Sequence, residues 1–254
     1  TMITDLAVSK SLHLDGRQAP RYPGWDLRME TLKASDNAAG PWVFLVSGFY
    51  AQADPEGTAA MQAWCRTDQS SKDGKIFPCL AVTVGAEWCT GLPAVQAAAQ
   101  GADFTFANEV EVMTLAKHIS KAAGTPEVDN FDAAMKVIAR WKGRGWMIGT
   151  RGSKTVGVIR AADAPELPLS VPVPMLPKEE FVDDVGAGDA FMGGFMAAIW
   201  QRLSALCDSE NVRKRKREDS LVAQLTNADL EAAAKAGISA ARACVRCSGC
   251  QFSS

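Results

Sequence analysis

The chain has 254 residues, of which 47% are hydrophobic and 22% charged, and a formal net charge of -2. This composition is ordinary for a globular protein, and the small net charge gives no field that favours nucleic acid, so we expect no nucleic-acid partner. No apolar run approaches the roughly 20 residues that span a bilayer, and no secretory signal is recognisable, so we expect no membrane association. The 7 cysteines, an odd number, do not form a disulfide framework, which favours a reducing, cytoplasmic compartment.

Residues 1–40 show no sustained hydrophobic period, and glycine and proline interrupt them repeatedly. We predict an irregular N-terminal segment over 1–40, with one helix near 27–34, and a single α/β domain over 41–254. The first residues, Thr1–Asp5, resemble the start of the β-galactosidase fragment that cloning vectors carry. The N-terminal segment is therefore open to interpretation as a fusion scar.

From Pro41 onward, short apolar runs alternate with stretches of helical period. Strands are predicted at residues 42–46, 76–82, 104–107, 145–149 and 154–160, and helices at 57–66, 92–99, 108–116, 131–142, 187–206 and 229–247. This alternation predicts an α/β fold, a three-layer α/β/α sandwich with a mostly parallel central sheet. Pro78 weakens the second strand, because proline cannot donate a hydrogen bond to a sheet. Ligands of such sheets bind beyond the carboxyl ends of the strands.

The segment Asp183–Phe195 has the residue types of a phosphate-binding turn. Gly186, Ala187 and Gly188 let the backbone approach a ligand closely, and the helix that follows presents unpaired N–H groups at the same place. Asp189 is a carboxylate inside this turn, where it would repel phosphate unless it acts as a base toward an attacking hydroxyl. The alternative is a surface turn followed by a helix with a capping aspartate.

Two further features help to choose between these interpretations. Gly193 and Gly194 lie inside the predicted helix, where each glycine costs roughly 1 kcal/mol relative to alanine, so the pair indicates close packing or close ligand approach. Spacing excludes a dinucleotide-binding motif, because Phe191 stands where a third glycine or alanine is needed and acids precede the turn. The phosphate-binding interpretation is therefore preferred.

The segment Asp183–Phe195 also resembles the signature of the ribokinase-like (PfkB) carbohydrate and nucleoside kinases, most closely that of the adenosine kinases. The resemblance implies ATP as co-substrate, Mg²⁺ as cofactor and adenosine as acceptor, with phosphorylation of the adenosine 5′-hydroxyl to AMP in purine salvage. It also implies that Asp189 is the catalytic base. The anion hole of the family corresponds to the amides of Gly186, Ala187 and Gly188.

Two other motifs follow predicted strand ends. Asn108 and Glu111 lie one turn apart at the start of a helix, which fits a capping box. The resemblance implies instead, or in addition, the Asn-x-x-Glu motif that orients water-bound Mg²⁺ and phosphate. Thr150 and Gly152 resemble the Thr-x-Gly turn that lies along the ATP phosphates in the family, although any hairpin can carry these residues.

The resemblance covers about residues 42–252 and lacks the N-terminal part that holds the ribose-binding residues and most of the lid in the family. It implies an N-terminally truncated ribokinase-like fold, with residues 1–40 as a lid remnant and an open sheet edge through which the chain self-associates. Asp184 also departs from the Thr, Ser or Pro usual in the family. Two alternatives stay open: a catalytically incompetent relative or fragment that binds nucleotide or a protein partner, and another sugar or nucleoside kinase.

Two other features near the C-terminus allow more than one interpretation. Arg213–Arg217 is a basic run with acids on both sides, so a solvated loop insertion is favoured over nuclear import or nucleic-acid binding. Cys244, Cys247 and Cys250 have the spacing of zinc or iron–sulfur ligands. A fourth ligand is missing from the nearby sequence, so a frayed helix end with ordinary thiols is favoured.

Overall fold

The computed structural model describes residues 40–66, 76–163, 166–207 and 221–248. The strands are β1 (Gly40–Ser47), β2 (Ile76–Thr83), β3 (Phe104–Asn108), β4 (Trp146–Thr150), β5 (Thr155–Arg160) and β6 (Leu169–Pro172). The helices are α2 (Gly48–Ala53), α3 (Pro55–Arg66), α4 (Pro93–Gly101), α5 (Glu109–Ala123), α6 (Phe131–Lys142), α7 (Ala187–Cys207) and α8 (Asn227–Cys244). The predictions for residues 1–39, with the helix near 27–34, and for Arg213–Arg217 lie outside the described residues.

The strands form one 6-stranded sheet in the order β1-β2-β3-β4-β5-β6. Strands β1 to β4 are parallel to one another, whereas β5 and β6 are each antiparallel to the strand before. The prediction of a mostly parallel sheet is therefore confirmed. Strand β6 was not predicted, because prolines surround its short run and proline is typical of loops and edge strands.

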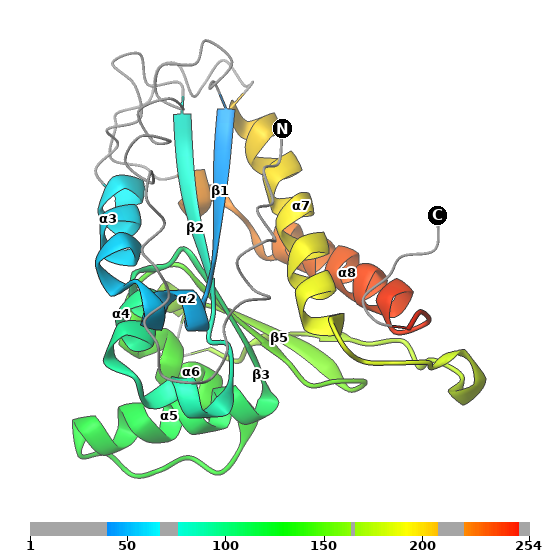
Figure 1. The fold of residues 1–254 in the computed structure, drawn as a ribbon, viewed down its shortest axis with the longest axis horizontal. Coiled ribbons are helices and arrows are strands. Elements are labelled where there is room, and N and C mark those ends of the chain that lie inside the picture. Colours follow the sequence, from blue (N-terminus) through cyan, green and yellow to red (C-terminus); the bar gives the residue numbers. More distant parts are fainter. Residues whose placement is uncertain (1–39, 67–75, 164–165, 208–220, 249–254) are drawn as a thin grey trace.

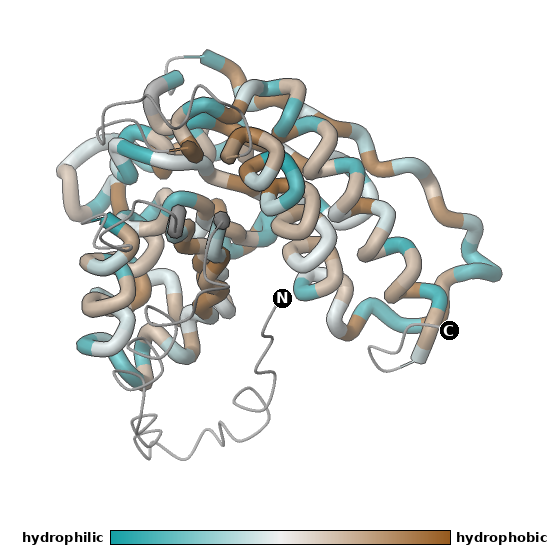
Figure 2. The backbone as a smooth tube through the Cα atoms, turned by 90° about the horizontal axis from the view of Figure 1, so that it is seen from above, coloured by the Kyte–Doolittle hydropathy of each residue, from teal (hydrophilic) through white to brown (hydrophobic). Residues whose placement is uncertain are grey.

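Helices cover both faces of the sheet (Figure 1). On one face, Phe104 and Phe106 of β3 pack with α7 and α8 in a cluster that also contains Trp146 and Ile148 of β4. On the other face, Met147 of β4 packs with α5 and α6. Hydrophilic and hydrophobic residues alternate along the helices (Figure 2), as expected for helices that cover a sheet with one side. The predicted three-layer α/β/α sandwich is confirmed.

Pro78 lies in β2 without breaking the sheet. It is paired in register with Trp42 of β1, but β2 meets β3 only from Ala81 to Thr83. On the β3 side, Pro78 therefore precedes the paired part of the strand, where a missing N–H costs no ladder hydrogen bond. The carboxylate of Asp103 accepts a hydrogen bond of 2.9 Å from the backbone amide of Leu80 at the point where β3 is about to begin.

Two helices differ from the sequence prediction. Helix α5 was predicted to end near Ala116 but continues to Ala123, since Ile119 and Ser120 are also buried and Gly124 provides the left-handed C-cap with φ 64°. Helix α2 was not predicted, because the run that follows β1 is too short to show a period. Ser47 caps α2 by accepting a hydrogen bond of 3.1 Å from the backbone amide of Tyr50.

Helices α7 and α8 pack closely at two glycines. A Cβ atom at Gly194 would lie 2.8 Å from the carbonyl oxygen of Ala236, and one at Gly237 would lie 2.7 Å from the carbonyl oxygen of Phe191. Gly193 has open space on its Cβ side, with nothing within 4 Å. The expectation that the helical glycine pair marks close packing is thus confirmed for Gly194. No helix in the described ranges is long and apolar enough to cross a membrane.

Strand β1 is an edge of the described sheet, and Leu45 on it is 39% exposed. We expect the chain to self-associate through this edge, because an apolar side chain exposed on an edge strand favours contact with a second copy. Light scattering over a concentration series should show a mass that rises with concentration, and the rise should weaken in Leu45→Lys. Leu167→Lys, at an apolar residue that is 72% exposed outside the strands, serves as control. A parent that stays monomeric at high concentration would contradict this expectation.

Candidate functional site

Two of the predicted motifs meet at the carboxyl edge of the sheet. Asn108 is the last residue of β3 and Thr150 the last residue of β4, and the two are register partners in the parallel pair. Beside them lies an open pocket of about 260 Å³. Its lining residues are Glu87, Asn108, Glu109, Val110, Glu111, Thr150 and Gly152. The cofactor-binding residues predicted from the two motifs therefore line one pocket.

Asn108 and Glu111 form a complete capping box at the start of α5. The Asn108 side chain accepts a hydrogen bond of 3.0 Å from the Glu111 amide, and the Asn108 amide donates one of 2.9 Å to Glu111 Oε2. Asn108 Nδ2 also donates to Glu111 Oε1, at 2.8 Å. The capping interpretation is confirmed, and each carboxylate oxygen keeps a further lone pair that can accept from a metal-bound water.

Burial raises the pKa of Glu111, and the hydrogen bond from the Asn108 backbone opposes this rise. Glu111 is only 8% exposed, although it lines the pocket. The buried Glu111 carboxylate accepts hydrogen bonds from Asn108, its partner in the capping box. Such a group gains from a nearby cation, because desolvation makes its charge costly when it is alone.

We expect Glu111→Gln to change the free energy of unfolding at neutral pH by less than about 1 kcal/mol, because glutamine can still complete the capping box. Because the pKa of Glu111 is raised in the folded state, the parent loses stability as the pH rises through that pKa. The free energy of unfolding of the variant should therefore increase relative to that of the parent as the pH rises. Urea denaturation across the acid range measures this, with the exposed Glu127→Gln as control, and a difference that does not change with pH would contradict it.

Helix α7 brings the third motif to the same edge. The ring of Phe191 lies 6.3 Å from that of Phe106 near the carboxyl end of β3, whereas Phe195 also contacts Phe104 at its start. At the far end of α7, Trp200 Nε1 donates a hydrogen bond of 3.0 Å to Pro41 O at the start of β1. Helix α7 thus runs against the strands, and its N-terminus lies at their carboxyl edge.

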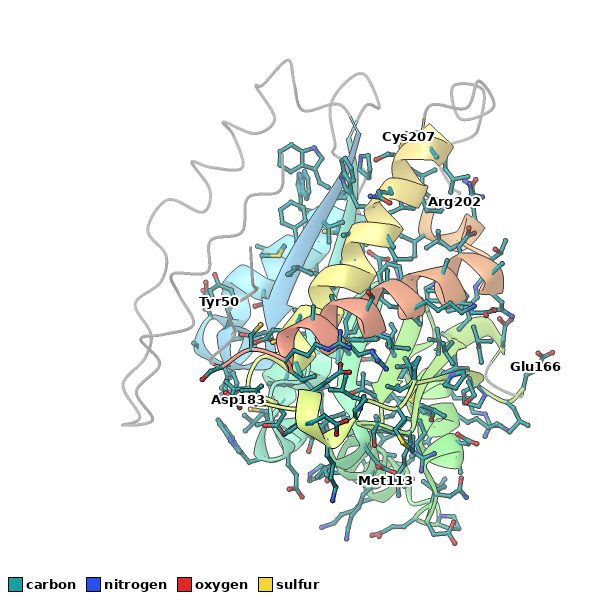
Figure 3. The ribbon with its side chains drawn as sticks, turned by 90° about the vertical axis from the view of Figure 1, so that its right-hand side faces the viewer. Tyr50, Met113, Glu166, Asp183, Arg202 and Cys207 are labelled. Carbon is teal, nitrogen blue, oxygen red and sulfur yellow. The ribbon has the colours of Figure 1, made fainter. Side chains whose placement is uncertain are left out.

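The view with side chains agrees with this direction. Asp183, which precedes α7, and Cys207, its last residue, lie at opposite ends of the layer formed by α7 and α8 (Figure 3). Asp183 lies toward the same end of the molecule as Tyr50, which follows the carboxyl end of β1. The structure thus brings Asp189 to the edge where Asn108 and Thr150 end their strands.

The turn before α7 has the geometry of an anion-binding helix start. Gly186 has a φ of 81°, in the left-handed region that favours glycine. The Ala187 amide donates to Asp184 O at 3.1 Å, and the Ala190 amide donates to Gly186 O at 2.8 Å. Among the described residues, the amides of Gly188 and Asp189 have no acceptor. The first turn of α7 therefore presents open N–H groups, although the Ala187 amide predicted for the anion hole is engaged in the turn.

Space around this turn is also open. A Cβ atom at Gly188 would meet nothing within 4 Å, and the side chain of Asp189 is exposed. A ligand can therefore approach both the backbone and the carboxylate. Of the amides at this helix start, those of Gly188 and Asp189 stay open to such a ligand among the described residues, whereas the Ala187 amide is used by the turn.

The end of α8 anchors this turn, a feature that the sequence did not predict. The Val245 carbonyl oxygen accepts hydrogen bonds from the amides of Val182, at 2.8 Å, and Asp183, at 3.2 Å. The buried Cys244 thiol lies 3.5 Å from the carbonyl oxygen of Val185. Arg246 pairs with Glu180 through a hydrogen bond of 2.7 Å from Nε. Of the proposed cysteine ligands, Cys250 lies outside the described residues.

The described ranges contain no group of three or more His, Cys, Asp or Glu residues placed to hold a metal ion by themselves. The pocket does offer hard oxygen donors, since the carboxylates of Glu87, Glu109 and Glu111 line it. Oxygen donors suit Mg²⁺, which keeps several water ligands and binds with substrate phosphates rather than in an all-protein cage. The donor chemistry therefore fits a magnesium ion that arrives with a nucleotide.

Comparison with known families decides the classification. The model of the pfkB family of carbohydrate kinases matches residues 29–254. The chain belongs to the pfkB family. The ribokinase-like α/β fold expected from the resemblance is thereby confirmed.

Relatives within this family include adenosine kinases. The chain is 34% identical to adenosine kinase 2 of Arabidopsis thaliana over 120 residues, which are 43% of this chain and 32% of that protein. An adenosine kinase structure from Anopheles gambiae, in complex with P1,P4-di(adenosine-5) tetraphosphate, superposes with a TM-score of 0.63 at 24% identity. That match covers 91% of this chain and 57% of that one.

Two further structures have the same fold. Adenosine kinase from Schistosoma mansoni, in complex with 2-fluoroadenosine, has a TM-score of 0.57 at 20% identity over 84% of this chain and 52% of its own. Fructokinase from Vibrio cholerae, bound to fructose, ADP and calcium, has a TM-score of 0.51 at 16% identity over 86% of this chain and 59% of its own. The chain thus spans a third to three fifths of the length of these relatives.

Proposed function

We propose that the chain transfers the γ-phosphate of ATP to the 5′-hydroxyl of adenosine and gives AMP, a reaction of purine salvage. The observation that carries this proposal is the convergence at one sheet edge. The open amides of α7 and the exposed Asp189 lie at the edge where Asn108, Thr150 and Gly152 line a pocket. A phosphate-binding helix start beside a carboxylate is what transfer to a hydroxyl acceptor requires.

In this reaction, Asp189 accepts the proton of the attacking hydroxyl as oxygen approaches the γ-phosphorus in line with the leaving group. The open amides of Gly188 and Asp189 at the helix N-terminus stabilise negative charge on the transferred group, while the Ala187 amide keeps the turn in shape. Thr150 and Gly152 lie along the nucleotide phosphates. Asn108 and Glu111 would hold a Mg²⁺ ion through water, and the ion would supply charge neutralisation at the phosphates. Positioning and electrostatics therefore account for most of the proposed catalysis.

Adenosine is proposed as acceptor because the curated relative and the structures with the higher TM-scores are adenosine kinases. The fructokinase match makes a sugar the second candidate acceptor. We also propose a cytoplasmic location, which the free thiols of Cys65, Cys79, Cys89 and Cys247 support.

The proposal is tested by incubating the chain with ATP and Mg²⁺ and with adenosine, ribose or fructose in parallel. Chromatography measures ADP and each phosphorylated product, and a reaction without acceptor measures hydrolysis. AMP formed only with adenosine supports the proposal, whereas turnover of a sugar alone replaces adenosine by that sugar.

A second candidate, a nucleotide-binding relative without turnover, is favoured by one observation. Asp189 is exposed, although proton transfer in a kinase is best shielded from water. Calorimetric titration with ATP and Mg²⁺ separates the candidates. ATP binding without product from any acceptor supports the binding protein, and absence of ATP binding overturns both.

A further inference from the structure

A cluster beside the pocket connects two motifs that are far apart in sequence. Arg151 follows Thr150 at the end of β4, and its Nε donates a hydrogen bond of 3.0 Å to Glu109 Oε1. A second nitrogen, Nη2, lies 2.9 Å from the same oxygen, so the hydrogen bond is also a close ion pair. Lys154, at the end of the same turn, places Nζ 3.4 Å from Glu109 Oε2. Glu109 is the first residue of α5, directly after Asn108.

The aromatic ring of Phe131 supports Arg151 from the other side. The Arg151 guanidinium carbon lies 4.8 Å from the centre of the Phe131 ring, within cation–π range. The ring is buried and occupies space left by two glycines that are register partners, Gly149 of β4 and Gly157 of β5. A Cβ atom would lie 2.5 Å from this ring at Gly149 and 2.9 Å from it at Gly157. Side chains at either glycine would displace the ring on which Arg151 rests.

The two basic side chains of this cluster differ in how far they are exposed. Arg151 is only 29% exposed at its side chain, compared with 61% for Lys154. The contact with Arg151 is therefore the better ordered of the two, since an ion pair with low exposure is screened less by solvent and salt.

The turn that this cluster holds is otherwise exposed. Gly152, Ser153 and Lys154 are exposed, and Gly152 has a φ of 56° with nothing within 4 Å of its Cβ side. Backbone hydrogen bonds of 3.0 Å from Arg151 N to Thr155 O and from Lys154 N to Arg151 O close it. These bonds fix the shape of the turn, but they do not fix its position relative to α5.

We infer that Glu109, Arg151 and Phe131 form a clasp that positions the Thr150–Gly152 turn against Asn108. The turn and the Asn108–Glu111 motif can then contact the nucleotide phosphates together. This inference rests on the proposed function, since it assumes that the pocket takes ATP. The clasp acts by ordering the turn before the nucleotide arrives, which reduces the conformational entropy lost on binding. Arg151 and Glu109 are thus positioning residues.

The test compares Arg151→Met with the parent chain by calorimetric titration with ATP and Mg²⁺. Methionine keeps an unbranched side chain over Phe131 but loses the charge and the hydrogen bonds to Glu109. We expect ATP affinity to fall roughly 10-fold, the effect of ordering about one residue on binding. Glu109→Gln should weaken ATP affinity less than Arg151→Met does. The double variant should bind ATP as tightly as Arg151→Met alone, because both substitutions remove the same interaction.

Arg160→Met is the matched control. Arg160 also lies over an aromatic ring in the β4–β5 hairpin, with its guanidinium carbon 5.8 Å from the centre of the Trp146 ring, but at the end away from the pocket. This variant should bind ATP like the parent. Hydrogen exchange of the amides from Thr150 to Thr155 gives a second measurement without nucleotide, and it should be faster in Arg151→Met only.

Each outcome separates the clasp from the proposed function. ATP binding by the parent with unchanged affinity in Arg151→Met overturns the clasp and leaves the function standing. Equal loss of affinity in Arg151→Met and Arg160→Met also overturns it, because the effect is then on general stability. Absence of ATP binding by the parent overturns the proposed function and this inference together, whatever the exchange rates are.

Discussion

Replacing Asp189 with asparagine should lower the rate of phosphoryl transfer about 10²- to 10⁴-fold, the usual cost of losing a general base. Asparagine keeps the shape and hydrogen-bonding capacity of the side chain but cannot take up the proton of the acceptor hydroxyl. Affinity for ATP should not fall, because removing a negative charge beside the open amides of α7 does not disfavour phosphate. Turnover with adenosine and calorimetric ATP affinity, measured side by side, check both statements.

Asp184→Asn is the control for this experiment. Asp184 lies in the same turn and its side chain is exposed, but only its backbone carbonyl takes part in the turn, by accepting from Ala187. Loss of this neighbouring charge should leave turnover within a few-fold of the parent. Equal rates in Asp189→Asn and the parent would reject Asp189 as the base. An undetectable rate in the parent that nevertheless binds ATP would favour the nucleotide-binding alternative.

The second large effect is expected at the contact between α7 and α8. Gly194→Ala should destabilise the fold by about 1–3 kcal/mol, because overpacking a close contact forces backbone to move. The new methyl group would lie 2.8 Å from Ala236 O, and 2.8 Å from the Cβ atom of Ala240. Gly193→Ala, one residue earlier, should instead stabilise by up to about 1 kcal/mol, since alanine is the better helix former.

The two substitutions are identical in chemistry and adjacent in one helix, so each is the control for the other. Midpoints of urea denaturation, measured under one set of conditions, give the sign of each effect. Opposite signs are expected. Destabilisation by both variants to the same extent would show that the close contact at Gly194 is not what requires glycine there.

Sequence reasoning succeeded where one residue pattern has one physical cause. The apolar runs before Ser47 and Asn108 are strands, although only the second is fully buried along its apolar run, and the period over Phe131–Lys142 matches the bounds of α6. The prediction that Gly193 and Gly194 mark a close helix contact was correct, but the sequence could not show which of the two glycines lies in that contact. That distinction depends on the angle at which α8 crosses α7, which residue order alone does not contain.

The site was predictable as separate motifs and not as an arrangement. Asn108 was given two interpretations, and the structure shows that the capping box is real without removing the oxygen atoms that the other role needs. The clasp was missed because Glu109 and Arg151 are far apart in sequence. One signal was present in the chain, since Gly149 and Gly157 flank the hairpin symmetrically and leave room for a large ring.

The order of the described elements has a consequence for synthesis on the ribosome. Helices α7 and α8 cover the sheet face that carries Phe104, Phe106 and Trp146, but they are translated after every strand of the described sheet (Figure 1). A nascent chain that has completed these strands therefore exposes an apolar sheet face until α7 and α8 emerge. Chaperone occupancy should peak in that interval, and a ribosome that stalls before Ala187 would release a product prone to aggregation.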